Sequence, residues 1–404
     1  MKGKLYFLQQ ILWFLQQPLH LFYAFVVWIL APLYKRQRES QKHPWVIGGH
    51  RGRIFADNSR ALYRYINAHS EQKILWIGNA ALCKELRSLG VNCLERNTWK
   101  ARIATLKAPV LIYSHGEDDL DQYALLWRGR LGLRVFVNHC MNHLKSGQWY
   151  KPGIEKMNFL HRKIYGWIMV NFDALLASSP LEADNFALAL PHLKEQIQLG
   201  GGAHIDDFIN MRTHKTQKRI LWFPTFREGS VESQHLQNTL QEVVQNSKLL
   251  AWLQHSQRTL VICHHINAKL SLKSSNSQIE FIAPSQLDKE LPRAELFISD
   301  YSGLLADWLI LDRPAMFFTF DLESYLQTRK FYLNYPDFVY GPWVQNSTDF
   351  IESLLSESWL ELEKWQDRRL HWQKLFFPSK KADYAANSLQ SINKLRTNFY
   401  SREL

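Results

Sequence analysis

Short apolar runs recur along the chain at intervals that suit an alternation of strands and helices. In the first half, the strand-like runs lie at residues 73–77, 91–94, 110–113, 134–137 and 170–179. In the second half, they lie at residues 219–223, 259–263, 294–299 and 315–320. Helix-forming segments lie between the runs, at residues 80–89, 234–254 and 304–311. Because parallel strands need such crossovers, the pattern predicts an α/β fold with two Rossmann-like domains.

The expected domain boundaries follow from breaks in this pattern. Residues 211–218 are polar and basic and lack apolar periodicity, which is typical of an interdomain linker. The predicted parts are a membrane-anchoring segment at residues 1–42, an N-terminal Rossmann-like acceptor domain at 43–212, a C-terminal Rossmann-like donor domain at 213–380 and a helical tail at 381–404.

The N-terminal segment is strongly apolar. Residues 5–34 contain no Asp, Glu, Lys or Arg, and this length is enough to span a bilayer, although Pro18 divides it. Lys35, Arg36 and Arg38 follow, which favours a catalytic body on the cytoplasmic face of the cell membrane. We predict a membrane anchor, spanning or interfacial, over the alternative of a buried core helix.

The charge balance indicates an anionic partner. The 404 residues carry a formal net charge of +12, and the sequence pI is about 9.4. This suits nucleic acid, a phosphate-rich substrate or an anionic membrane face, and charge alone does not choose among them. The four cysteines form no CxxC pair, so we expect neither a zinc site nor a disulfide framework, in keeping with a reducing cytoplasm.

The most informative turn joins the run at residues 294–299 to the helix at 304–311. It contains Asp300, Ser302 and Gly303. A helix start presents unpaired N–H groups and the positive end of the helix dipole, and both favour phosphate. The alternative is that Asp300 or Ser302 only caps the helix.

Two other runs of the second half also end in polar residues. Thr225 and Arg227 follow one run, and His264 and His265 follow the next. Ligands in open α/β sheets lie beyond the carboxyl ends of the strands, so Thr225 and Arg227 are candidates to hold phosphate. The alternatives are a surface turn with an exposed arginine and a core histidine. Two adjacent histidines alone do not make a metal site.

The first half contains two further candidates. His139 and Lys145 lie in the loop that follows the run at residues 134–137. Asp119 and Asp121 form a DxD pattern, which in another class of glycosyltransferases holds a metal with nucleotide phosphates. We favour a solvated helix start as the explanation of this acidic cluster, and no metal ligand is predicted.

The sequence around Asp300 resembles the C-terminal signature of the CDP-glycerol glycerophosphotransferases, the enzymes that polymerise teichoic acids and similar capsule polymers. The matching elements are ISDYSG, Asp307, DRPAMFFTFDLESY, Arg329, Phe331 and Tyr332. The resemblance extends over residues 46–344 and includes PTFR and an Asp-Asn pair before a helix. It implies the GT-B fold, in which two Rossmann-like domains face a cleft.

The resemblance also implies roles for individual residues. His139 matches the presumed catalytic base, and His265 matches a second functional histidine, with His264 nearly as good a match. The residues implied in binding the donor and its phosphates are Thr225, Arg227, His264, Asp300, Ser302, Gly303 and Arg329. Lys145 and Asn58 match the acceptor side. The chain departs from the family pattern at Cys140, Ala203, His204 and Lys330.

The expected reaction is transfer of glycerol phosphate, or a related polyol phosphate, from a CDP-activated donor to a hydroxyl of a lipid-linked surface polymer, with release of CMP. The CDP-polyol is a substrate, and we expect no cofactor, no metal and no nucleic acid. One alternative is a GT-B glycosyltransferase that uses a nucleotide sugar. Another is a non-catalytic basic membrane protein that binds a polymer. The sequence leaves the polyol, the acceptor and the oligomeric state open.

Overall fold

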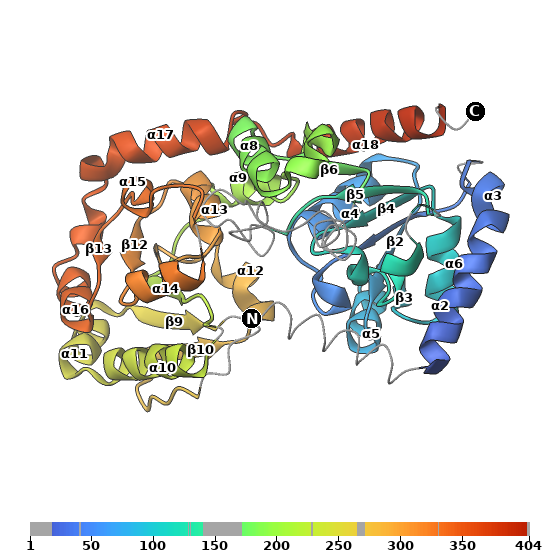
Figure 1. Ribbon diagram of the computed structural model, residues 1–404. Coiled ribbons are helices and arrows are strands. Elements are labelled where there is room, and N and C mark those ends of the chain that lie inside the picture. The colour runs from blue at the N-terminus through green and yellow to red at the C-terminus, as the bar shows by residue number, and fades with distance from the viewer. Residues whose placement is uncertain are drawn as a thin grey trace. The chain divides into compact units, whose positions relative to one another are not determined.

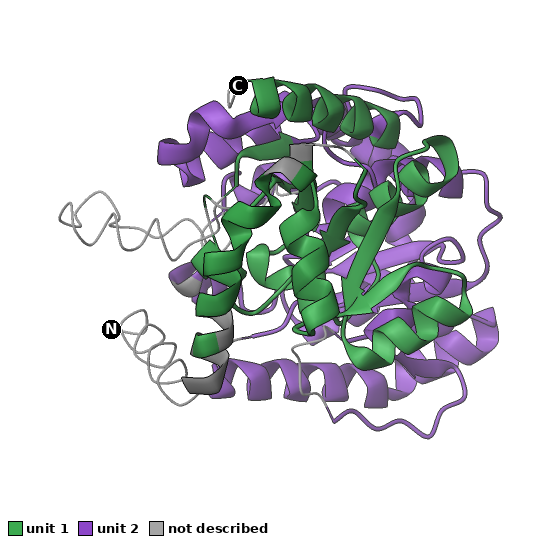
Figure 2. Cartoon of the chain, turned by 90° about the vertical axis from the view of Figure 1, so that its right-hand side faces the viewer, with its two compact units in different colours: residues 1–139, 153–176, 385–404 green, residues 140–152, 177–384 purple. Residues whose placement is uncertain are grey.

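The computed structural model describes residues 18–39, 42–127, 129, 131–139, 172–227, 229–264, 271–329 and 331–401. The chain divides into two compact units, which Figure 2 shows in different colours. Unit 1 comprises residues 1–139, 153–176 and 385–404, and unit 2 comprises residues 140–152 and 177–384.

A seven-stranded sheet has the strand order β3-β2-β1-β4-β5-β6-β7. Figure 1 labels β2 to β6 of this sheet. Its strands are β1 (Trp45–Gly48), β2 (Ile74–Gly78), β3 (Cys93–Glu95), β4 (Val110–Tyr113), β5 (Leu133–Phe136), β6 (Ala174–Ala177) and β7 (Ile197–Leu199). The first six strands pair in parallel. Helices α4 (Asp57–His69), α5 (Ala80–Ser88) and α6 (Trp99–Lys107) connect them. Since helices cover both faces of a parallel sheet, β1, β2 and β4 are apolar and buried throughout.

Unit 2 contains a six-stranded sheet in the order β10-β9-β8-β11-β12-β13, and all of its pairings are parallel. Its strands are β8 (Arg219–Phe223), β9 (Thr259–Cys263), β10 (Ile279–Ile282), β11 (Leu296–Ser299), β12 (Ala315–Phe318) and β13 (Trp343–Val344). Two parallel sheets with intervening helices confirm the predicted α/β class.

Successive residues of β11 belong to two different hydrophobic clusters. Leu296 and Ile298 pack with residues such as Leu240 of α10 (Ser230–Gln245). Phe297 packs instead with Trp308 of α13 (Leu304–Leu311). Side chains of a strand point alternately to opposite faces, so the central strand contributes to a core on each side of the sheet.

The segment formed by β11, α13 and β12 has the predicted order of strand, helix and strand. Seven of the eight residues of α13 are buried, as expected of a helix that is apolar on all sides. The helix ends at Asp312, whose φ of 56° is left-handed, and Trp308 Nε1 donates to the carbonyl oxygen of Pro314 at 2.8 Å. These contacts fix the helix behind the turn that contains Asp300.

The helix predicted at residues 234–254 is in fact two helices. The side chain of Asn246 accepts hydrogen bonds from the N–H groups of Lys248 and Leu249. It therefore starts a new helix, α11 (Ser247–Ser256), where the apolar pattern alone suggested continuity.

The division into units differs from the predicted boundary at the linker. Arg313 donates to the carbonyl oxygens of Met211 and His214, which holds this segment within unit 2. Most of the predicted helical tail, residues 381–404, also falls within unit 1. Most of α18 (Tyr384–Ser401) belongs to unit 1, where the Tyr400 hydroxyl donates to Pro109 O. Neither long-range contact has a local signal in the sequence.

The described part of the N-terminal segment forms α2 (Pro18–Leu30), a 3-10 turn and α3 (Lys35–Glu39). Val27 and Ala31 are fully buried, and Arg38 donates to the carbonyl oxygens of Ala31 and Leu106. This segment therefore packs against unit 1. Within the residues that the structure describes, no helix has both the length and the apolar character needed to cross a membrane. Residues 1–17 lie outside the described part.

The cysteines correct one expectation. Cys83 of α5 and Cys93 of β3, with Cα atoms 5.5 Å apart, form a disulfide within unit 1. The packing of α5 beside β3 brings together two cysteines whose spacing in the sequence gave no such signal. Cys263 is buried at the end of β9, and burial raises the pKa of its thiol to about 12.

Candidate functional site

Three histidines lie at the carboxyl edge of the seven-stranded sheet. His50 follows β1, His115 follows β4 and His139 follows β5, and these strands are neighbours. The ring centroids of His50 and His115 are 4.2 Å apart, as are those of His115 and His139. Those of His50 and His139 are 6.2 Å apart. We call these three residues the histidine cluster. Of them, only His139 was predicted as a site residue.

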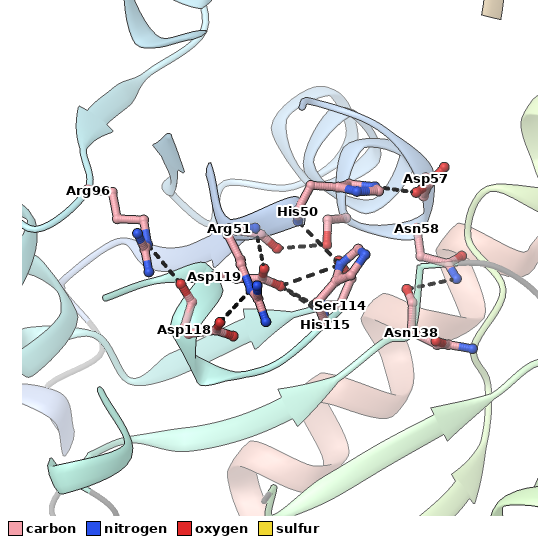
Figure 3. A network of polar contacts seen from close by, with 12 residues as sticks. His50, Arg51, Asp57, Asn58, Arg96, Ser114, His115, Asp118, Asp119 and Asn138 are labelled. Atoms are coloured by element: carbon pink, nitrogen blue, oxygen red, sulfur yellow. Dashed lines mark hydrogen bonds and ion pairs between the residues drawn. The ribbon is translucent and has the colours of Figure 1, made fainter. Parts of the chain in front are cut away.

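Asp57, at the start of α4, holds one ring of the cluster. Its Oδ2 lies 2.6 Å from Nε2 of His50. A dashed line marks this contact in Figure 3. A carboxylate on one imidazole nitrogen fixes the orientation of the ring and favours its protonated form. The backbone N–H of His50 donates to Nδ1 of His115 at 3.3 Å. Neutral His115 therefore carries its proton on Nε2.

Asp119 connects the loops that carry His50 and His115. Its carboxylate accepts the backbone N–H groups of Arg51, Ser114 and His115 at 2.7, 2.9 and 2.8 Å (Figure 3). Burial raises the pKa of Asp119, and these N–H groups oppose the rise. The carboxylate therefore serves as a structural acceptor.

The DxD pattern thus has a different explanation from the predicted solvated helix start. Both of its aspartates are buried, Asp119 completely and Asp121 to 1% exposure. Asp121 pairs with the buried Arg102 at 2.9 Å. Arg51 and Arg102 bind the two carboxylates from other segments, and backbone N–H groups of the same loop complete the set. The metal alternative would need those same oxygens.

The backbone around the histidine cluster is strained. His50, Arg51, Asp57 and Asn138 have φ values of 49°, 54°, 57° and 54°, in the left-handed region that residues other than glycine rarely adopt. Each such residue costs about 1–3 kcal/mol and persists only where surrounding contacts hold it. Four of them at one sheet edge mark a candidate functional site.

Asn58, which was predicted to lie on the acceptor side, connects α4 to the loop after β5. Its side-chain amide donates to the carbonyl oxygens of Val137 and Asn138 at 2.9 and 3.3 Å. It is 3% exposed, so it supports the loop that leads to His139. Helix α4 starts at Asp57 after Ala56, without a side-chain cap from Ala56. Lys145, Cys140 and His265 lie outside the described residues.

The predicted donor residues of unit 2 gather at the carboxyl edge of its sheet. His264 follows β9, Thr225 and Arg227 follow β8, and the turn from Asp300 to Gly303 follows β11. These three strands are neighbours in the order β9-β8-β11. The sheet thus brings together segments separated by about forty residues each in the sequence. Arg329 follows α14 (Leu322–Thr328) in the same unit and is half-buried.

Arg227 is surrounded by carboxylates. Its guanidinium binds both oxygens of Asp321, at 2.6 and 2.9 Å, and Oδ2 of Asp300 at 2.9 Å. It also donates to Thr225 O at 2.6 Å. The hydroxyl of Tyr301 donates to Asp321 Oδ1 at 3.0 Å. We call Arg227, Asp300, Asp321 and Tyr301 the arginine cluster.

The arginine cluster is deeply buried, since Arg227 is 7%, Asp300 2% and Asp321 9% exposed. Burial by itself would lower the pKa of Arg227, but the charges of Asp300 and Asp321 outweigh it, so that the pKa lies above its ordinary value. Burial, followed by the charge of Asp321, raises the pKa of Tyr301. Arg227 is therefore a permanent cation and Tyr301 a neutral donor at every pH of interest.

These contacts give two predicted donor residues partners within the protein. Arg227 was expected to hold phosphate, but two carboxylates take up its guanidinium. Asp300 was expected to bind the donor or to cap the helix. It instead accepts the N–H groups of Thr225 and Tyr301, at 2.9 and 2.6 Å, and pairs with Arg227. Both residues fix the PTFR turn against the turn after β11. Asp321 and Tyr301 were missed because only the folded chain brings them to Arg227.

Thr225, Ser302 and Gly303 remain at this edge with groups suited to an anion. Within the described part of the chain, Thr225 Oγ1 is buried and has no hydrogen-bond partner. Ser302 Oγ accepts the N–H of Leu304, and Gly303 is the residue from which α13 starts. The N–H groups and dipole of α13 therefore point out from this turn.

The chain also matches a known protein family. Residues 34–387 match the model of the CDP-glycerol:poly(glycerophosphate) glycerophosphotransferase family. The chain belongs to this family. The resemblance inferred from residues 46–344 is thereby confirmed.

Individual relatives are more distant. A teichoic acid glycerol-phosphate transferase of Staphylococcus aureus is 21% identical over 337 residues, which cover 75% of this chain and 81% of the relative. A teichoic acid poly(ribitol-phosphate) polymerase of Bacillus spizizenii is 28% identical over 148 residues. That match covers 36% of this chain and 23% of the relative, so the chain spans only part of the polymerase.

The fold also occurs in a solved glycerophosphotransferase-related structure. A variant of the wall teichoic acid polymerase TagF soaked with CDPG has a TM-score of 0.65 and 16% identity to this chain. The likeness covers 95% of this chain and 99% of the TagF chain. At 16% identity, this likeness shows a shared fold and nothing more.

Proposed function

We propose that this chain transfers glycerol phosphate or a related polyol phosphate from a CDP-activated donor to a hydroxyl of a lipid-linked cell-surface polymer. The observation that carries the proposal is the set of donor segments at the ends of β9, β8 and β11, in a chain that belongs to the glycerophosphotransferase family. The names of its relatives, a glycerol-phosphate transferase and a ribitol-phosphate polymerase, support a polyol phosphate as the transferred group.

In the proposed reaction, the acceptor oxygen forms a bond to the phosphorus next to the polyol. The bond between that phosphorus and the bridging oxygen of CMP breaks, and CMP leaves with the electron pair. His139 takes the proton of the acceptor hydroxyl as general base, the role that the family resemblance implies. Phosphoryl transfer depends mainly on positioning and on neutralising the charge that moves onto the leaving group.

The donor side of the proposal rests on unit 2. Thr225 Oγ1, the Ser302 hydroxyl and the start of α13 at Gly303 would bind the diphosphate, with help from Arg329 and from His264 or His265. Arg227 and Asp300 would act indirectly, by holding the two turns in place. A cleft between two facing Rossmann-like domains, as in the GT-B fold, is part of the same proposal.

The proposal is tested by offering the purified, detergent-solubilised chain CDP-glycerol, CDP-ribitol and a panel of nucleotide sugars with a lipid-linked acceptor. Acceptor-dependent release of CMP from a CDP-polyol is the expected result. Turnover of a nucleotide sugar alone would instead support a glycosyltransferase. No turnover of any donor, with retained salt-dependent polymer binding, would favour a binding protein.

Thr225→Val gives a sharper test of the donor site, because it should stabilise the fold while it weakens binding of the donor. Removing a buried hydroxyl without a partner should raise the free energy of unfolding by up to about 1 kcal/mol. Losing a hydrogen bond to a charged phosphate should weaken CDP-polyol binding roughly 10- to 100-fold. Calorimetric titration and urea unfolding measure the two effects.

Thr239→Val is the matched control for Thr225→Val. Thr239 is also buried in unit 2, at 7% exposure, but lies in α10 among core residues. This control should leave the affinity for the CDP-polyol unchanged. Equal binding by wild type and Thr225→Val would remove Thr225 from the donor site.

We also propose that α2 attaches the protein to the surface of the cytoplasmic leaflet without crossing it. Large apolar side chains are exposed along α2 and the turn after it, namely Phe22, Phe25, Trp28, Ile29 and Leu33. The opposite side, with Val27 and Ala31, is buried against unit 1. An apolar face beside the exposed Lys35, in a chain of net charge +12, suits the interface of an anionic bilayer.

The variant Phe25→Ser/Leu33→Ser tests this attachment, since these side chains are 57% and 71% exposed. Full burial of one such side chain is worth about 1.5–3 kcal/mol, so even partial burial of the two in the bilayer interface predicts a fall in binding to anionic vesicles of roughly tenfold or more in the variant. Vesicle co-sedimentation measures the loss. The control Leu188→Ser/Val231→Ser removes equally exposed apolar groups from unit 2 and should bind as wild type does. Undiminished binding by the α2 variant would refute a role of this face.

A further inference from the structure

We infer that His50, paired with Asp57, is a further catalytic residue of the acceptor-side site, where its imidazolium donates a hydrogen bond to the phosphoryl group in transfer. This inference rests on the proposed function and assigns a role to two residues outside the predicted site. His139 remains the group that accepts the proton of the acceptor hydroxyl.

The geometry supports different protonation states for the two rings. The Asp57 carboxylate, 2.6 Å from Nε2 of His50, favours the charged form of that ring. The centroid of His139 lies 6.2 Å from that of His50, with His115 stacked beside it at 4.2 Å. A second positive charge within such a cluster is unfavourable, so a charged His50 favours a neutral His139. A neutral imidazole is the form required of a general base.

The other charged groups around His50 have defined partners. Arg51 Nε pairs with Asp118 Oδ2 at 2.7 Å, and Asp119 accepts the backbone N–H groups of Arg51 and His115. Asp119 Oδ2 lies farther from the ring of His115, at 3.9 Å from Nδ1. Asp57 is therefore the carboxylate with the closest contact to an imidazole of the histidine cluster. Its close contact favours the positive charge on His50 over a positive charge on the other two rings.

Accessibility and backbone conformation agree with a catalytic role. The side chains of His50 and Asp57 are 19% and 34% exposed, so they lie at the surface of the sheet edge where ligands bind in open α/β folds. Both residues also have left-handed φ values. A structural ion pair would not need two strained residues, whereas strain of this kind concentrates where side chains must be aimed at a ligand.

In the inferred step, atoms and charges balance without a further reactant. The acceptor oxygen bonds to phosphorus, its proton moves to His139, and CMP departs with the electrons of the broken P–O bond. His50 keeps its proton throughout and donates a hydrogen bond to a non-bridging phosphoryl oxygen. Such a donor acts on charge that is held on the phosphoryl group as the reaction proceeds.

The test compares wild type, His50→Gln, Asp57→Asn and the control His69→Gln in the CMP-release assay between about pH 5.5 and 9.5, with the CDP-polyol that wild type uses. His50→Gln should lower kcat by about 10²- to 10³-fold. Asp57→Asn should move the alkaline limb of the kcat profile to lower pH by roughly one unit or more, because His50 then loses its proton more readily. His69 is exposed in α4 of the same unit, and its variant should match wild type.

Thermal unfolding of each variant separates a loss of catalysis from a loss of fold. A wild-type alkaline limb in Asp57→Asn, or a loss of less than about threefold in His50→Gln, would overturn the inference while leaving the proposed function intact. Absence of CMP release by wild type with every donor would overturn the proposed function and this inference together.

Discussion

Arg227→Met is expected to destabilise unit 2 by about 3–5 kcal/mol, the range observed when one partner of a buried ion pair is removed. The methionine fills much of the space but leaves the carboxylates of Asp300 and Asp321 buried without their cation. Their mutual repulsion and their loss of hydration both act against folding. The free energy of unfolding from urea titration is the measurement.

The control for this prediction is Arg293→Met, the same substitution at an arginine that is 41% exposed and pairs with Glu290. Glu290 is buried but keeps its second partner, Arg219, at 2.7 Å, and an ion pair with one exposed side chain contributes about 0–1 kcal/mol, so this variant should unfold nearly as wild type does. Equal stability of the two variants would show that the arginine cluster is not what holds the turns of unit 2.

The effect of Arg227→Met on donor binding follows from the same contacts. Asp300 accepts the N–H of Thr225 and is itself held by Arg227, so the turn that carries Thr225 would lose its support. CDP-polyol affinity should fall together with stability. At a subdenaturing temperature where Arg227→Met is still folded, unchanged affinity would contradict this indirect role.

His139→Gln is expected to lower kcat for CMP release by about 10²- to 10⁴-fold, the contribution typical of a general base. Glutamine retains hydrogen bonding but does not accept a proton. The affinity for the CDP-polyol should stay close to that of wild type, since the predicted donor residues lie in unit 2 and His139 lies in unit 1. Steady-state kinetics and calorimetric titration measure the two quantities.

The unfolding temperature of His139→Gln should be within the range of the His69→Gln control. A residual rate within about tenfold of wild type would exclude His139 as the base, because a general base contributes more than that. The His50→Gln and Asp57→Asn profiles then show whether another member of the histidine cluster carries the proton.

Many residues of the candidate site could be predicted, because ligand-binding residues of open α/β sheets follow the carboxyl ends of the strands. Thr225, His264, Ser302 and His139 each come directly after an apolar run, and a parallel sheet brings such positions to one edge. The order of strands in the sheet was not needed to place these residues at an edge. It was needed to see that β9, β8 and β11 are neighbours.

The missed residues share one property, which is that their partners are distant in the sequence. His115 was not among the predicted site residues, because its contacts with His50 and His139 exist only once β1, β4 and β5 are aligned. Asp321 lies 94 residues from Arg227, and no spacing rule connects them. The family resemblance likewise implied a phosphate role for Arg227 that its buried partners do not support.

By itself, the sequence determined the α/β class, most strands to within two or three residues, the membership of the glycerophosphotransferase family and the strand-end positions of the candidate residues. These depend on local periodicity, on turn residues and on a motif read in order. Only the tertiary structure decided the pairings within the histidine and arginine clusters, the break at Asn246 and the return of α18 to unit 1. The physical reason is that burial and ion pairing depend on which segments meet in space, whereas hydrophobic periodicity depends on neighbours along the chain.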